Sequence, residues 1–265
     1  MGGAAFFDLD KTVIAKSSTL AFGRTFYQGG LVNRRAVLRS SYAQFVYLIA
    51  GADADQMARM RDYLKGLCAG WPVDQVRSIV EEALHDLIDP LVYDEAVSLI
   101  EGHQAAGRAV VIVSSSGEEV VTPIAEMVGA DHAIATRMVI EDGRYTGDIA
   151  FYAYGVHKAE AIEALAAEQG WFLADCWAYS DSITDLPMLD AVGHPVVVNP
   201  DKALRRVAVQ RGWEVRDFTR PVGLRSRVPT FTRPPVPVLA GAAVGVGAVA
   251  LGWRMLAARR RATRC

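Results

Sequence analysis

Four short apolar runs, each leading directly into a polar residue, constrain the fold of this chain most. They are "AAFF" at residues 4–7, "AVVIV" at 109–113, "CWAYS" at 176–180 and "PVVVN" at 195–199. Segments with helical periodicity lie between the later runs, at about 94–106, 118–129 and 157–169. Apolar strands that alternate with helices are typical of a parallel sheet covered on both faces, so the sequence predicts an α/β fold with a doubly wound parallel sheet.

Two segments depart from this alternation. Residues 15–92 have helical periodicity and little strand signal; in "SSYAQFVYLIAG" the apolar residues Tyr42, Phe45, Val46 and Ile49 fall on one helix face. We therefore expect an inserted all-helical domain there. The dipeptide Asp142-Gly143 separates two alternating runs, which predicts a β-hairpin.

The predicted organisation has five parts. Residues 1–14 and 93–218 form the core, 15–92 the helical cap, 219–235 a Pro- and Arg-rich linker, 236–253 a candidate transmembrane helix and 254–265 a basic tail. With 265 residues, 51% of them hydrophobic, the chain is long enough for a large core and an inserted module.

Charge and cysteine content limit the environment of the protein. Residues 1–218 hold 19 basic and 30 acidic residues, whereas residues 219–265 hold nine arginines and no acid. The three cysteines, Cys68, Cys176 and Cys265, have neither a disulfide pattern nor zinc-ligand spacing, which fits a reducing compartment. The first strand begins too early to leave room for a cleaved signal peptide, so we expect a cytoplasmic catalytic domain.

Polar residues follow the predicted strands at the edge where a doubly wound sheet binds its ligand. They are Asp8, Asp10 and Thr12 after the first strand, Ser114, Ser115 and Ser116 after the second, Lys158 at a helix start, and Asp181 and Asp185 after "CWAYS". Carboxylates are hard ligands for Mg²⁺, and a lysine with hydroxyl groups stabilises a phosphoryl group. A carboxylate held there can act as a nucleophile, so the set predicts a site for a phosphate ester and a divalent cation.

Each of these pieces also has an ordinary structural interpretation. A D-x-D after a strand is commonly a solvated turn, three serines are commonly a loop, and a lysine at a helix start is commonly on the surface. "SDSITD" is equally consistent with a helix N-cap followed by a capping acid. The order of the four pieces, each at a predicted strand or helix end, favours the phosphate site.

The four pieces "DLDKT", "VIVSSS", Lys158 and "SDSITD" resemble the ordered motifs of the haloacid dehalogenase superfamily. The helical insert between the first two resembles the cap of its phosphoserine-phosphatase-like branch, subfamily IB, and the resemblance covers residues 4–218 of a Rossmann-like core and cap. It implies a phosphatase that requires Mg²⁺ and forms an aspartyl phosphate.

The resemblance also implies a role for each residue. Asp8 is expected to be the nucleophile and Asp10 the acid/base, with a raised pKa. Asp8, Asp181 and the backbone carbonyl of Asp10 are expected to bind the metal. Ser114 and Ser115 are expected to bind the substrate together with Lys158, which neutralises the phosphoryl oxygens, while Thr12 and Asp185 support the site.

One departure from the resemblance bears on the substrate. In phosphoserine phosphatases an acidic residue soon after the first motif meets the amino group of the substrate, but Lys16, Ser17 and Ser18 supply no carboxylate here. An amino-acid substrate is therefore not favoured. Lys16 is either a solvated lysine at the start of the cap or a contact for a second anionic group, and the Tyr42 face either packs within the cap or shapes an apolar pocket.

The C-terminal region contains 18 residues without charge, from Val236 to Trp253, followed by "RRR" at 259–261. As a helix this segment reaches about 27 Å, which is just enough to span a bilayer. Gly241 and Gly245 form a G-x-x-x-G, which can pack two such helices into a homodimer. The alternative is a helix that docks on the catalytic domain.

These features predict a Mg²⁺-dependent phosphomonoesterase that acts on a small or amphiphilic phosphate ester, held at a membrane by one C-terminal segment. A soluble small-metabolite phosphatase is the second enzymatic interpretation. A membrane-anchored regulatory or phosphate-binding protein is the alternative from another class, although a binding protein has no need of an acid/base at Asp10. Nucleic-acid binding is not expected, because the arginines are not interleaved with aromatic residues.

Overall fold

The computed structural model describes residues 2–31 and 68–221. The chain divides into two units, Met1–Arg227 and Val228–Cys265, and the second lies outside the described residues. The first unit contains a seven-stranded sheet with the order β4-β3-β2-β1-β5-β6-β7. Its strands are β1 (Ala4–Asp8), β2 (Ala109–Gly117), β3 (His132–Glu141), β4 (Arg144–Phe151), β5 (Trp177–Ser180), β6 (His194–Val198) and β7 (Glu214–Arg216).

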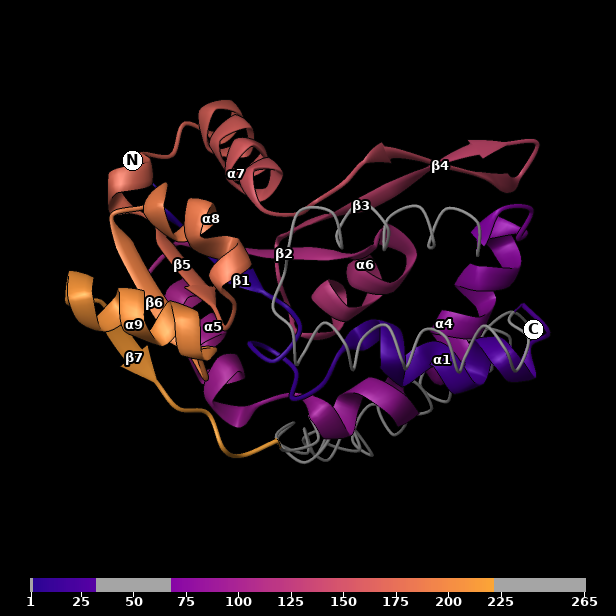
Figure 1. Ribbon diagram of the computed structural model, residues 1–265, viewed down its shortest axis with the longest axis horizontal. Coiled ribbons are helices and arrows are strands. Elements are labelled where there is room, and N and C mark those ends of the chain that lie inside the picture. Colours follow the sequence, from indigo (N-terminus) through magenta and orange to yellow (C-terminus); the bar gives the residue numbers. More distant parts are fainter. Residues whose placement is uncertain (1, 32–67, 222–265) are drawn as a thin grey trace, which may run out of the picture. The chain divides into compact units, whose positions relative to one another are not determined.

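The sheet is parallel except at one edge, as Figure 1 shows. β1 lies in the middle, between β2 and β5, so its residues Ala4 to Asp8 are buried on both faces. β3 and β4 form the predicted antiparallel hairpin. Its two turn residues, Asp142 and Gly143, have φ angles of 48° and 72°, which is the left-handed geometry that a two-residue hairpin turn requires.

Helices precede or connect most of the strands. The α-helices are α1 (Ser18–Gln28), α4 (Val73–Ile88), α5 (Asp94–Ala105), α6 (Glu118–Met127), α7 (Val156–Gln169), α8 (Leu186–Asp190) and α9 (Lys202–Arg211); the short 3₁₀ helices are η1 (Asp89–Leu91), η2 (Leu173–Asp175) and η3 (Ile183–Asp185). The predicted helices at 94–106, 118–129 and 157–169 are confirmed to within two residues at each end. The sequence interpretation did not predict α8, α9 or β7.

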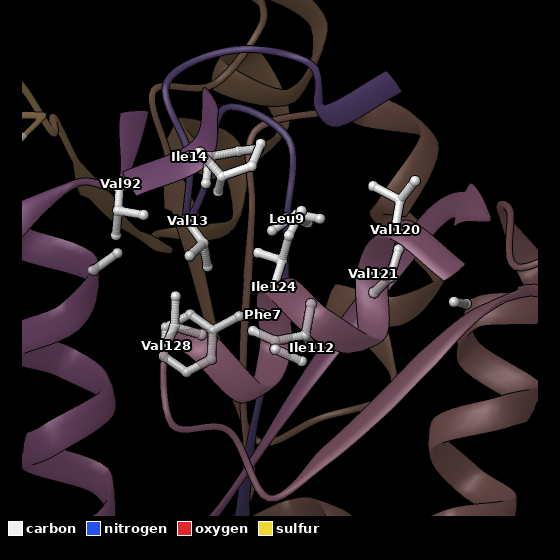
Figure 2. Packing of buried hydrophobic residues seen from close by; sticks show 14 of the residues in the cluster. Phe7, Leu9, Val13, Ile14, Val92, Ile112, Val120, Val121, Ile124 and Val128 are labelled. Carbon is white, nitrogen blue, oxygen red and sulfur yellow. The ribbon is translucent and has the colours of Figure 1, made fainter. Parts of the chain in front are cut away.

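Two apolar clusters cover the two faces of the sheet. Phe7 and Ile112 point to the face covered by α5 and α6, while Phe6 and Val111 point to the face covered by α7, α8 and α9. Neighbouring residues of a strand point to opposite faces, so a strand that is apolar throughout needs a helix layer on each side. Figure 2 shows the first cluster, where Phe7 and Ile112 pack close to Val121 and Ile124 of α6 and to Val128, the residue after this helix. The prediction of a doubly wound α/β fold is confirmed.

The helical segment leaves the core and returns to it at one place. The Ala15 N–H donates to the Leu91 carbonyl over 2.8 Å, and the Tyr93 N–H donates to the Val13 carbonyl over 2.9 Å. Between these points the described residues form α1, α4 and η1 and no strand. The predicted face of Tyr42, Phe45, Val46 and Ile49 lies outside the described residues, and the boundaries of the cap stay a prediction.

The tip of the β3–β4 hairpin is bonded to the start of α4. The Val73 N–H donates to the Gly143 carbonyl over 3.0 Å, and the Gly70 N–H donates to the Tyr145 carbonyl over 2.8 Å. The Arg144 guanidinium donates to the Gly70 carbonyl, also over 2.8 Å. The hairpin is therefore a second connection between the core and the helical segment, which the sequence did not predict.

No helix within residues 2–31 and 68–221 is long and apolar enough to cross a membrane. The predicted segment 236–253, the linker beyond Pro221 and the basic tail lie outside the described residues.

Candidate active site

The two carboxylates predicted to bind metal lie at the ends of neighbouring strands. Asp8 is the last residue of β1, and Asp181 comes directly after the last residue of β5. β1 and β5 run parallel with Phe7 opposite Tyr179, so both strands end at the same edge of the sheet. Both aspartates are buried, with 7% and 8% of their surfaces exposed. The sheet therefore brings together two acidic residues that are far apart in the sequence.

Lys158 lies between two of the carboxylates. Its Nζ donates to Asp8 Oδ1 over 2.6 Å and to Asp185 Oδ2 over 2.9 Å. The lysine is in the first turn of α7 and only 2% of its surface is exposed. Asp185 Oδ2 also accepts a hydrogen bond of 2.7 Å from the Ser180 hydroxyl. The structure thus brings Lys158 and Asp185 together with Asp8, while their functional roles stay a prediction.

Burial and like charges shift the pKa values of these groups. Burial raises the pKa of Asp8 well above its usual range, and the nearby Asp185 and Asp181 add to this effect, while Lys158 opposes it. Burial also raises the pKa of Asp181, to about 7. Burial alone lowers the pKa of Lys158, but Asp185 and Asp8 outweigh it and raise that pKa above its usual value. The lysine therefore stays charged beside three clustered carboxylates.

Asp10 lies in the tight turn after β1. The Leu9 carbonyl accepts bonds from the Val13 and Ile14 N–H groups over 2.9 and 3.0 Å, and this reverses the chain. Asp10 Oδ1 accepts a bond of 2.8 Å from the N–H of Ser18, the first residue of α1. Burial raises the pKa of Asp10 against the opposing hydrogen bonds from Ser18 and Ser17, which is the direction that a general acid needs.

The supporting Thr12 is fully buried in the same turn. Among the described residues its Oγ1 has no hydrogen-bond partner. Lys11 in the same turn has a φ of 60°, and its Nζ lies 3.8 Å from Asp181 Oδ2. This half-exposed lysine is a second cation near the site that the sequence interpretation did not single out.

The three serines after "AVVIV" have different surroundings. Ser114 is buried and its Oγ accepts a bond of 3.2 Å from the Ser116 N–H. The Ser115 side chain is exposed, and its carbonyl accepts a bond of 2.7 Å from the Thr136 hydroxyl. Ser116 is buried against the start of α1. A shift of strand register between Ser114 and Gly117 accompanies these differences. That Ser114 and Ser115 bind the substrate stays a prediction.

The site suits a divalent cation that uses water and substrate ligands in addition to protein oxygens. Among the described residues no three His, Cys, Asp or Glu side chains are grouped closely enough to hold a metal by themselves. The predicted set of Asp8, Asp181 and the Asp10 carbonyl supplies fewer carboxylates than that, as is common for Mg²⁺. Burial is the main cause of the raised pKa values of Asp8 and Asp181, and repulsion from neighbouring carboxylates adds to it; a bound cation would relieve both effects.

Asp201 supports the site and the sequence interpretation missed it. Its Oδ2 accepts a bond of 2.9 Å from the Ile183 N–H, and its own N–H donates to the Asp181 carbonyl over 2.8 Å. Its Oδ1 caps α9 by accepting bonds from the Ala203 and Leu204 N–H groups, both 2.8 Å. The aspartate before the amphipathic segment "KALRRVAV" is a helix N-cap signal that could have found it.

The "SDSITD" segment combines its two predicted interpretations. Ser182 Oγ accepts a bond of 3.3 Å from the Thr184 N–H and so caps η3, while Asp181 and Asp185 face the site. Lys16 is exposed at the start of the helical segment, and neither Ser17 nor Ser18 is acidic.

A lysine buried between carboxylates at the carboxyl edge of a doubly wound sheet is suited to bind a phosphate ester. The family model described as haloacid dehalogenase-like hydrolase matches residues 5–190. The chain belongs to this family, and it is a phosphatase.

Two of three similar relatives are named as phosphatases. The chain is 64% identical over 261 residues to the "Inhibition of morphological differentiation protein" of Streptomyces azureus, covering 98% of this chain and 94% of that protein. It is 61% identical over 258 residues to a "Probable phosphatase" of Mycobacterium tuberculosis, covering 97% and 89%. It is 35% identical over 217 residues to a phosphoserine phosphatase of the same organism, covering 81% and 70%.

Two solved structures are similar in fold. A protein of unknown function from Bordetella pertussis has a TM-score of 0.72 and 31% identity, covering 82% of this chain and 99% of that one. A phosphoserine phosphatase solved as a phospho-aspartyl intermediate analogue has a TM-score of 0.59 and 21% identity, covering 85% and 96%.

Proposed function

We propose that this phosphatase is a Mg²⁺-dependent phosphomonoester hydrolase that works through an aspartyl phosphate on Asp8. The observation that carries the proposal is the placement of Asp8 at the end of the central strand, 2.6 Å from the buried Lys158 Nζ, with Asp10 two residues further on. A nucleophile must be ionised; burial raises the pKa of Asp8, and the neighbouring Lys158 ammonium opposes this and favours the ionised form.

In the first step an Asp8 carboxylate oxygen attacks phosphorus, and the bond from phosphorus to the ester oxygen breaks. Asp10 gives its proton to that oxygen, so the leaving group departs as a neutral alcohol. Lys158 offsets the negative charge of the phosphoryl oxygens, and the Ser114 hydroxyl donates a hydrogen bond to one of them. In the second step Asp10 takes a proton from the water that attacks the aspartyl phosphate, which releases inorganic phosphate and restores Asp8.

The bound cation supplies charge neutralisation for the phosphate oxygens and for the clustered carboxylates. Asp8, Asp181 and the carbonyl of Asp10 are the groups that would hold it. Asp201 contributes by fixing the backbone that follows Asp181, because it bonds to the Asp181 carbonyl and to the Ile183 N–H.

We propose a small or amphiphilic phosphate ester without a free amino group as the substrate class. Neither Ser17 nor Ser18, at the start of α1, offers the carboxylate that an ammonium group would need, and Lys16 is exposed there. The phosphoserine phosphatase among the relatives therefore does not fix the substrate of this chain.

The test is phosphate release by the purified full chain from a panel that includes phosphoserine and lysophosphatidic acid, with Mg²⁺ or with EDTA. Acid quenching followed by mass spectrometry of the Asp8 peptide detects the aspartyl phosphate. We expect release that requires Mg²⁺ and is abolished in Asp8→Asn. A folded full chain that releases phosphate equally well with Asp8→Asn would refute the mechanism, and the best ester decides the substrate class.

We also propose that residues 236–253 hold the protein at a membrane with its catalytic domain in the cytoplasm. Support comes from the sequence alone: 18 residues without charge, with arginines on both flanks. The test is flotation of the full chain with vesicles that contain anionic lipid, compared with Val246→Arg in the segment and with Val228→Arg in the linker as a matched control. The proposal is supported if Val246→Arg fails to float while the unchanged chain and Val228→Arg both float. It is overturned if neither the unchanged chain nor Val228→Arg floats.

A further inference from the structure

Three hydroxyl groups join the start of α1 to the end of β2. Ser18 Oγ lies 2.8 Å from Ser116 Oγ, and Thr19 Oγ1 lies 3.1 Å from the same atom. Ser18 is fully buried and Ser116 is 7% exposed, so their mutual bond is shielded from water. The two serines are 98 residues apart in the sequence. This contact fixes the first turn of the helical segment on the core strand that carries Ser114.

The same turn of α1 holds Asp10. The Ser18 N–H is one of the first amide groups of the helix, which have no acceptor within the helix, and it donates to Asp10 Oδ1 over 2.8 Å. Asp10 itself lies outside the named strands, in the turn after β1. The backbone hydrogen bonds of the sheet therefore fix Asp8 and do not fix Asp10. The orientation of the Asp10 side chain depends instead on the position of the N-terminus of α1.

Ser116 is in turn held by the backbone of β2. Its N–H donates to Ser114 Oγ over 3.2 Å, and it lies within the register shift between Ser114 and Gly117. Such an irregularity re-aims a side chain at the end of a strand. Here it leaves the Ser116 hydroxyl directed at Ser18 and not at the neighbouring strand.

We propose that Ser116 and Ser18 are positioning residues, whose hydroxyl pair places the N-terminus of α1 so that the Ser18 N–H holds Asp10 in the orientation of a proton donor. This inference rests on the proposed role of Asp10 as the general acid. Neither hydroxyl needs to contact the substrate. Their effect appears only in steps in which Asp10 transfers a proton.

The test compares two esters of similar size, p-nitrobenzyl phosphate and p-nitrophenyl phosphate, with the full chain in Mg²⁺. The benzyl alcohol is a far weaker acid than the nitrophenol, so only its departure needs a proton from Asp10. The quantity measured is kcat/KM, which reports the steps up to transfer of the phosphoryl group to Asp8. Asp10→Asn is the reference, and Ser78→Ala on the exposed side of α4 is a matched control.

We expect Ser116→Ala to lower kcat/KM for the benzyl ester about 10-fold and for the nitrophenyl ester by less than about 2-fold. Ser18→Ala should have the same effect. The double variant should have a kcat/KM for the benzyl ester no lower than that of the less active single variant, because the two hydroxyls act as one unit. The ratio of the two esters on one preparation does not depend on the fraction of folded protein.

Four results overturn the inference. If Ser116→Ala lowers kcat/KM equally for both esters, or for neither, while Asp10→Asn lowers it selectively for the benzyl ester, the positioning role fails and the acid role of Asp10 stands. If Asp10→Asn slows both esters equally, or if the wild type hydrolyses neither, the proposed acid role of Asp10 fails and the inference fails with it.

Discussion

Replacing Lys158 by methionine should destabilise the protein strongly and abolish turnover. The Nζ atom lies 2.6 Å from Asp8 Oδ1 and 2.9 Å from Asp185 Oδ2, and the lysine is 2% exposed. At an effective dielectric constant of about 20 each of these contacts has an attraction of about 6 kcal/mol. Most of this offsets the desolvation of the charges, so the net loss on breaking a buried pair is about 3–5 kcal/mol.

A double-mutant cycle separates this explanation from a simple loss of packing. In Lys158→Met two buried carboxylates are left facing each other without a cation. Adding Asp185→Asn removes one of them, so we expect Lys158→Met/Asp185→Asn to be more stable than Lys158→Met, with a coupling free energy of about 2 kcal/mol or more. Lys11→Met is the matched control; that lysine is half-exposed at 3.8 Å from Asp181, and its loss should cost less than about 1 kcal/mol.

The assay is urea denaturation of the full chain at pH 8 in EDTA, which removes any bound cation. The losses in free energy of unfolding caused by Lys158→Met and by Asp185→Asn alone are summed and compared with the loss in the double variant. If the two agree within about 0.5 kcal/mol, the charge argument is wrong. In Mg²⁺ the same Lys158→Met protein should lose at least about a hundredfold in kcat, because the phosphoryl oxygens lose their fixed counter-charge.

Three further substitutions test the supports of the fold. Gly193→Ala should lower the free energy of unfolding by about 1–3 kcal/mol, because the added Cβ would meet the Ala174 carbonyl. The control is Gly102→Ala on α5, where the added Cβ has open space and should leave the stability unchanged or raise it. Thermal melting compares the two variants. Burial lowers the pKa of His103 to about 4, so the folded state keeps this histidine neutral where the unfolded state binds a proton. About 3 kcal/mol of the free energy of unfolding is therefore present above pH 6.5 and is lost as the pH falls from 6.5 to 4. His103→Gln should flatten this part of the profile of stability against pH, and an unchanged profile would contradict the assignment. Asp201→Ala should cost about 1–2 kcal/mol through the lost cap of α9 and also lower kcat, while Asp201→Asn, which keeps an acceptor oxygen, should lose less of both.

The strands and long helices could be predicted because their signals are local. β1 and β2 are apolar runs buried on both faces, and the Asp142-Gly143 turn has the residues that its left-handed backbone requires. α8 has five residues and β7 has three, so neither is long enough to develop a period. The sequence interpretation missed α9 although Asp201 is an N-cap signal for this helix.

The candidate site residues could be picked out for the same local reason, since they lie at or near the ends of strands or open a helix. The groups that position them are not. Ser180 orients Asp185 from the preceding strand, and Asp201 holds the loop of Asp181 from the segment between β6 and α9. These contacts depend on how the sheet orders its strands, with β1 between β2 and β5, and the order of strands is not written in any single segment.

The same reasoning explains why Ser116 looked like part of a loop in the sequence. A serine pair across 98 residues has no period and no charge, and its meaning depends on the parallel register that puts Asp8 opposite Val113. The end of β2 lies beside the start of α1, so Asp10 receives its hydrogen-bond partner from the helical segment, while Asp8 receives its own from α7. The two carboxylates of the D-x-D therefore differ in their surroundings although they are two residues apart. Burial raises the pKa of both, but Asp8 has the Lys158 ammonium beside it whereas Asp10 accepts a backbone N–H, and the proposed roles of nucleophile and proton donor call for such a difference.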